Sequence, residues 1–121
     1  MNILVIGGLS KVGFALTCNL SMDHSVTIID NCNSIECIKE FQEKIPSNVI
    51  YYKFDINDDK NFSMFTNILG DNDLIYLLIE EYNQDLLEYI QENHLNIKFK
   101  TDLNFEQILN EYNSKNWDLA H

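Results

Sequence analysis

The chain has 121 residues and a mass of 14.2 kDa, which is the size of one domain. Hydrophobic residues make up 45% of it, so the composition predicts a packed core and excludes a disordered chain. The formal net charge is −11 and every basic residue is a lysine, a balance poorly suited to neutralising phosphate backbones or anionic bilayers. We therefore expect neither a nucleic-acid nor a membrane partner.

Short apolar runs alternate along the chain with longer segments of helical periodicity, which is typical of a parallel sheet covered on both faces. The predicted strands are Asn2–Ile6, Ser25–Ile29, Val49–Phe54, Leu74–Ile79 and Asn96–Lys100. The predicted helices are Lys11–Ser21, Ser34–Lys44, Lys60–Leu69, Gln84–Asn93 and Phe105–Ser114. This order predicts one α/β domain of three layers over residues 1–121.

The turn after the first predicted strand carries the glycine spacing of a phosphate-binding loop. Counted from Gly7 or from Gly8, the pattern ends at Gly13 and has Ser10 where the middle glycine of a dinucleotide-binding loop stands. The Ser10 hydroxyl can cap the following helix or donate to a phosphate, and both roles stay open. The candidate phosphate-binding residues are Gly7, Gly8, Ser10, Lys11, Val12 and Gly13. This loop predicts a Rossmann-like domain with strand order 3-2-1-4-5.

Acidic residues follow the second and third predicted strands. Asp30 stands where a carboxylate binds the ribose hydroxyls of an adenosine, which favours NAD over NADP because no arginine would balance a 2′-phosphate. Asp55, with Ile56, would lie beside the adenine in a sheet of this order. The alternatives are that Asp30 only serves a turn and that Asp55 only caps the next helix. The candidate adenosine-binding residues are Asp30, Asn31, Asp55 and Ile56.

Glu80 and Glu81 follow the fourth predicted strand, beside the position of a nicotinamide. Bulky acidic groups there would crowd or repel the second half of a dinucleotide. Either the ligand ends at its adenosine and phosphates, or these glutamates point away.

The cysteines and histidines do not predict a metal site. Cys32 and Cys37 have only His24 as a candidate further ligand, which is too few for a tetrahedral set. The odd number of cysteines, which includes Cys18, fits reduced thiols in a cytoplasm better than a disulfide framework. We expect a cytoplasmic protein without a bound metal.

The segments MNILVIGGLSKVG, VTIIDN, VIYYKFDINDDKNF and NDLIYLL resemble the N-terminal, NAD-binding half of extended short-chain dehydrogenase/reductases, the NAD-dependent epimerase/dehydratase family. The resemblance covers roughly residues 1–79. It implies pyrophosphate contacts at Gly7, Ser10 and Gly13, ribose contacts at Asp30 and Asn31, and adenine contacts at Asp55 and Ile56. The family's catalytic Tyr-x-x-x-Lys pair has no counterpart, since Tyr112 and Lys115 are one residue too close, and the substrate half is absent.

The chain is also similar to TrkA-N type domains, the nucleotide-binding units of potassium-transport regulators, in its size and in SKVG of the glycine loop. A response-regulator receiver has the same number of βα units, but it needs acidic residues where Gly7 and Gly8 stand. We therefore expect an NAD(H)- or adenine-nucleotide-binding domain without its own catalytic residues. Its expected role is sensing or accessory, with a protein partner or a second copy of the chain.

Two other functions remain open. The first is an epimerase-like or dehydrogenase-like oxidoreductase completed by a partner chain. The second is a degenerate domain that serves as a protein-interaction module, with Trp117 as a candidate contact.

Overall fold

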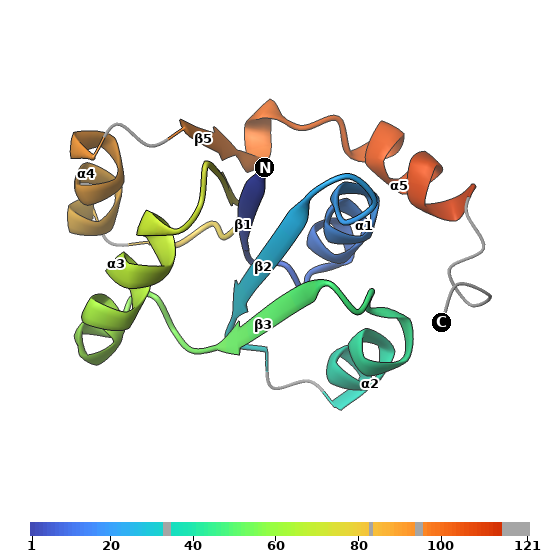
Figure 1. The fold of residues 1–121 in the computed structure, drawn as a ribbon, viewed down its shortest axis with the longest axis horizontal. Helices are drawn as coiled ribbons and strands as arrows, with labels where there is room; N and C mark the ends of the chain where they lie inside the picture. The colour runs from blue at the N-terminus through green and yellow to red at the C-terminus, as the bar shows by residue number, and fades with distance from the viewer. Residues whose placement is uncertain (33–34, 83, 94–95, 115–121) are drawn as a thin grey trace.

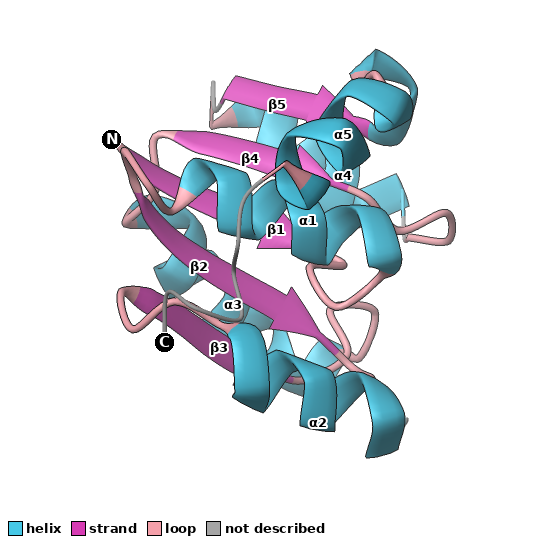
Figure 2. Cartoon of the chain, turned by 90° about the vertical axis from the view of Figure 1, so that its right-hand side faces the viewer, coloured by secondary structure: helices cyan, strands magenta, loops and turns pink. Residues whose placement is uncertain are grey.

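The computed structural model describes residues 1–32, 35–82, 84–93 and 96–114. Its strands form one parallel sheet in the order β3-β2-β1-β4-β5 (Figure 1 and Figure 2). The strands are β1 (Asn2–Ile6), β2 (Ser25–Asp30), β3 (Val49–Lys53), β4 (Leu74–Leu77) and β5 (Asn96–Phe99). The α-helices in this part of the chain are α1 (Lys11–Leu20), α2 (Ile35–Lys44), α3 (Phe62–Gly70), α4 (Gln84–Glu92) and α5 (Phe105–Asn113).

The predicted elements agree with the observed ones to within about two residues at each described end. The largest differences are at β4, which ends at Leu77, and at α3, which begins at Phe62. Before α3, the Asp58 carboxylate accepts a hydrogen bond from the Lys60 backbone N–H at 3.1 Å. This cap starts a 3₁₀ turn over Asp59–Asn61, so the regular helix begins at Phe62, two residues later than predicted.

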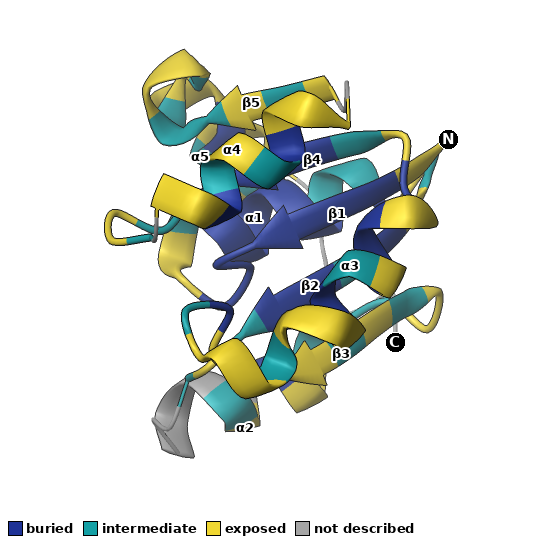
Figure 3. Cartoon of the chain, turned by 90° about the vertical axis from the view of Figure 1, so that its left-hand side faces the viewer, coloured by how far each residue is buried: buried dark blue, intermediate teal, exposed yellow. Residues whose placement is uncertain are grey.

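Helices cover both faces of the sheet, which confirms the three-layer prediction (Figure 2). One face packs against α3 and α4 through buried side chains that include Leu4, Phe65 and Ile90. The opposite face packs against α1 and α5 around Val5 and Ile108. Figure 3 shows the central strands buried and the outer helix surfaces exposed. Strands buried on both faces explain why the sequence shows continuous apolar runs there.

The strand order changes direction at β1, which has β2 on one side and β4 on the other. In an open parallel sheet, ligands bind outside the carboxyl ends of the strands at such a switch point. The order also excludes the receiver alternative, because receivers have the order 2-1-3-4-5. The fold therefore places the candidate site at the carboxyl ends of β1 and β4.

Within the described ranges, no helix is both long and apolar enough to cross a bilayer.

Candidate functional site

The turn from β1 to α1 depends on glycine at Gly7 and at Gly13, for two different reasons. Gly7 has a φ of +90°, a left-handed conformation that other residues rarely adopt, and its N–H donates to the Ile29 carbonyl at 2.8 Å. Gly13 lies so close to the turn that a Cβ there would be 3.0 Å from the Gly8 Cα and would overlap the Gly7 carbonyl oxygen. The helix α1 can therefore begin directly against the turn only with glycine at position 13.

Gly8 is required for a different close approach. A Cβ at Gly8 would lie 2.5 Å from Cγ2 of Ile28, which is buried in β2. The Gly8 backbone therefore packs directly against the Ile28 side chain, and there is no room for a larger residue at position 8.

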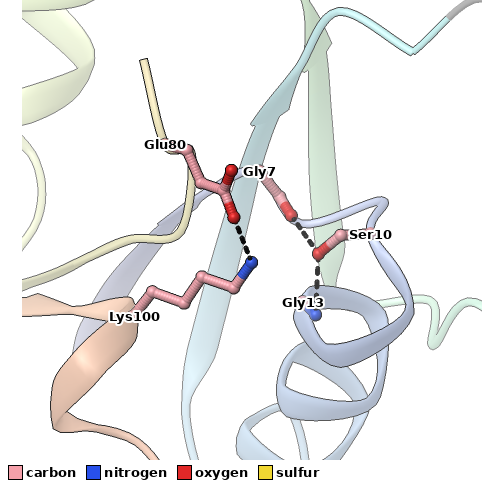
Figure 4. A network of polar contacts seen from close by, with 5 residues as sticks. All are labelled: Gly7, Ser10, Gly13, Glu80 and Lys100. Carbon is pink, nitrogen blue, oxygen red and sulfur yellow. Dashed lines mark hydrogen bonds and ion pairs between the residues drawn. The ribbon is translucent and has the colours of Figure 1, made fainter. Parts of the chain in front are cut away.

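The structure distinguishes between the two roles left open for Ser10. Its hydroxyl donates to the Gly7 carbonyl at 2.9 Å and accepts from the Gly13 N–H at 3.0 Å (Figure 4). Ser10 is thus the N-cap of α1. Because the hydroxyl proton is already donated within the loop, Ser10 caps the helix in this structure and a hydroxyl contact with phosphate would require its rotation.

Asp30, at the end of β2, contacts the glycine loop. Its Oδ2 accepts the Leu9 N–H at 3.0 Å, and its backbone carbonyl accepts a long hydrogen bond of 3.4 Å from the Tyr51 hydroxyl. Burial raises the pKa of Tyr51 above 10.0, with smaller contributions from the charges of Asp30 and Cys32. The Asp30 carboxylate therefore points toward the glycine turn. The sequence predicted that these two parts of the chain share one site.

Asp55 forms a turn after β3, and the helix-capping role left open for it belongs to Asp58. The Asp55 carboxylate accepts the Asn57 N–H at 2.9 Å, and its carbonyl accepts from the Asn61 side-chain amide at 3.0 Å. Ile56 is buried in the core beneath α3 and α4. Adenine contacts at Asp55 and Ile56 stay predictions.

A hollow of about 510 Å³, here called the strand-end hollow, lies at the carboxyl ends of β1, β2, β3 and β4. Its lining residues are Ile6, Ile29, Asp30, Asn31, Phe54, Asp55, Ile56, Asn57, Leu78, Ile79, Glu80, Glu81 and Lys100. It brings together all four predicted adenosine-binding residues. It forms at the switch point, where open parallel sheets generally bind their ligands.

The predicted phosphate-binding residues do not line this hollow. Ser10 and Lys11 line a separate hollow of about 500 Å³ between α1, α2 and α5. Gly7, Gly8 and Gly13 are buried, and Val12 packs against the α1 and α5 core. The glycine turn therefore contributes its shape and the start of α1 to the candidate site.

Sequence reasoning missed Lys100. This residue begins a 3₁₀ turn directly after β5, and its Nζ lies 3.1 Å from Glu80 Oε1 after β4 (Figure 4). Its position at the end of the last predicted strand was the signal that could have found it, because β4 and β5 are neighbours and their carboxyl ends meet. Glu80 and Glu81 are exposed, and Glu80 directs its charge at Lys100.

Lys100 and Glu80 also line a second hollow of about 670 Å³ beside the first, here called the β5 hollow. Its other walls are mainly apolar: Leu77, Ile79, Tyr82, Phe99, Leu103 and Phe105, with Thr101. The ion pair therefore lies where the two hollows adjoin.

The described residues contain no cluster of three or more His, Cys, Asp or Glu side chains that could hold a metal ion. Cys18 is buried and Cys32 is partly buried. Trp117 and Lys115 lie outside the described residues.

No protein-family model and no curated protein sequence matches the chain. Among solved structures, it is similar to UDP-N-acetylglucosamine 4-epimerase from Methanobrevibacter ruminantium in complex with UDP-N-acetylmuramic acid. That match has 29% identity and a TM-score of 0.53, over 76% of this chain and 30% of the epimerase.

Two further structures are also similar to it. UDP-glucose-4-epimerase from Stenotrophomonas maltophila, with bound NAD and formylated UDP-arabinopyranose, has 20% identity and a TM-score of 0.52, over 94% of this chain and 33% of that one. Serine dehydrogenase from Escherichia coli has 17% identity and a TM-score of 0.49, over 63% of this chain and 37% of that one. The chain thus spans about a third of the length of these enzymes.

The Rossmann-like fold predicted from the glycine loop is confirmed by the strand order and by the Stenotrophomonas epimerase. The 29% identity to the Methanobrevibacter epimerase is in line with the predicted resemblance to the epimerase/dehydratase family. The similarity to TrkA-N type domains stays a prediction.

Proposed function

We propose that this chain binds an adenine nucleotide, with NAD(H) as the first candidate, at the carboxyl ends of β1 to β4. The observation that carries the proposal is the strand-end hollow at the β1/β4 switch point, with Asp30 beside the glycine turn. Support also comes from the epimerase with 29% identity and from the NAD bound to the Stenotrophomonas epimerase.

Asp30 is the proposed ribose-binding residue. One oxygen of its carboxylate holds the Leu9 N–H, and among the described residues no donor hydrogen-bonds to the other oxygen. That oxygen can accept from the ribose hydroxyls while the first keeps the loop in place. A 2′-phosphate would bring its negative charge to this carboxylate, so the proposed preference is for NAD(H) over NADP(H).

The proposed role is sensing or accessory, in complex with a protein partner or a second copy of the chain. It rests on the lack of a Tyr-x-x-x-Lys pair in the sequence. A second candidate function, an epimerase-like or dehydrogenase-like activity completed by other residues, is favoured by the identity to the Methanobrevibacter epimerase. Hydride transfer that occurs only when a partner is added would support this second function.

Calorimetric titration with NAD⁺, NADH, NADPH, ATP and AMP tests the proposal. Asp30→Asn keeps an oxygen that accepts the Leu9 N–H but removes the negative charge. It should therefore weaken the binding of NADH about tenfold and reduce the difference in affinity between NADH and NADPH. Asp23→Asn is the matched control, because Asp23 is exposed in the turn before β2, at the opposite end of that strand. Absence of binding by every nucleotide at millimolar concentration would refute nucleotide binding and favour an interaction module.

A further inference from the structure

We propose that Lys100 binds the phosphates of the nucleotide, and that Glu80 holds the Lys100 ammonium until a phosphate replaces it. This inference rests on the proposed nucleotide site. It adds a phosphate-binding residue outside the glycine loop, from the end of β5.

The charges that line the strand-end hollow make such a cation necessary. Four carboxylates line it, those of Asp30, Asp55, Glu80 and Glu81. Lys100 is the single cationic side chain among the described residues that line this hollow or the β5 hollow. Without it, a phosphate would meet only like charges, which weakens binding. The whole sequence has no arginine to replace it.

The position of Lys100 matches the path of a phosphate from the glycine turn. Glu80, which pairs with Lys100 at 3.1 Å, follows Ile79. A Cβ at Gly7 would lie 3.2 Å from Cγ2 of Ile79, so the glycine turn and this segment are in close contact. The ammonium is therefore anchored beside the place where the turn meets the end of β4 (Figure 4).

Two contacts hold the Lys100 side chain over the hollow. Its Nζ pairs with Glu80 and lies 5.8 Å from the centre of the Phe105 ring. The Lys100 side chain is 41% exposed and that of Glu80 is 80% exposed. An ion pair with so exposed a carboxylate is weak and opens readily, so a diphosphate group, which carries at least two negative charges, can displace Glu80.

The hydrogen bonds inside the glycine loop also favour a phosphate-binding lysine outside it. The Ser10 hydroxyl donates to Gly7 and occupies the Gly13 N–H, so both groups are engaged inside the loop. A loop that offers fewer donors binds phosphate more weakly, and a charge-assisted hydrogen bond from lysine offsets that loss.

The test compares adenosine, AMP and ADP by calorimetric titration on the wild-type chain and on Lys100→Met, which keeps the length and apolar stem of the side chain. Lys100→Met should weaken the binding of ADP about tenfold and change the affinity for adenosine by less than about twofold. The matched control is Lys98→Met, because Lys98 lies on β5 over the Tyr76 ring and lines neither hollow. It should leave all three affinities unchanged.

A second variant tests the restraint by Glu80. Glu80→Gln removes the carboxylate charge that competes for Lys100. It should increase the affinity for ADP about threefold and leave the affinity for adenosine unchanged. Equal thermal unfolding midpoints of the variants and the wild type would verify that folding is unaffected.

The outcomes separate this inference from the nucleotide site itself. If the wild type binds adenosine and ADP but Lys100→Met changes neither affinity, the Lys100 inference is wrong and the site stands. Equal weakening of adenosine and ADP would also overturn it, since that result indicates a structural role. If the wild type binds none of the nucleotides, both proposals fail.

Discussion

Replacing Gly13 by alanine tests whether α1 is fixed against the glycine turn. The new Cβ would lie 2.8 Å from Ser10 Oγ and 3.0 Å from the Gly8 Cα, and would overlap the Gly7 carbonyl oxygen. Two of these neighbours are backbone atoms, which cannot move away by changing a rotamer. The helix would have to shift, although it carries the fully buried Cys18 of the core.

The expected cost follows from these contacts. Overpacking of this kind costs about 1–3 kcal/mol. Loss of the Ser10 cap on the Gly13 N–H adds about 1 kcal/mol, and the higher helix propensity of alanine returns about 0.5–1 kcal/mol. We therefore expect Gly13→Ala to lower the free energy of unfolding by about 1–3.5 kcal/mol.

Urea unfolding followed by circular dichroism measures this change, with Gly70→Ala as the matched control. Gly70 is also helical, as the last residue of α3, and a Cβ added there would meet no atom within 4 Å beyond its own helix and chain neighbours. That substitution should be neutral or stabilise the chain by up to about 1 kcal/mol. Equal unfolding midpoints for the two variants would show that α1 is not constrained by the turn, contrary to our reasoning.

Two further predictions concern the same region. Ser10→Ala should cost about 1 kcal/mol of unfolding free energy and Ser10→Gly only a few tenths, because glycine is tolerated at an N-cap; equal losses in urea unfolding would argue against capping as its role. Because the pKa of Tyr51 is raised, the folded chain keeps the phenol proton to a higher pH than the unfolded chain does. Its contribution to stability is complete below pH 10.0 and is lost as the pH rises above it. Tyr51→Phe should therefore reduce the fall in melting temperature between about pH 9 and 11. If melting temperature depends on pH in the same way in the variant and the wild type, the raised pKa of Tyr51 does not contribute to stability.

The sequence by itself determined the fold class and the position of the strands. Continuous apolar runs mark strands buried on both faces, and three- and four-residue spacing marks the helices, so both features are local in the chain. The roles of Gly7 and Gly13 were predictable for the same reason, because a left-handed turn and a close helix start depend on neighbouring residues.

Only the tertiary structure decided which side chains contact one another at the candidate site. The Asp30 contact with Leu9 joins the end of β2 to the glycine turn, and the Lys100 contact with Glu80 joins the end of β5 to that of β4. Both contacts depend on strand neighbours that are distant in sequence, so no local spacing predicts them. The sequence contained the residues of the site, but their pairing follows from the order of strands in the sheet.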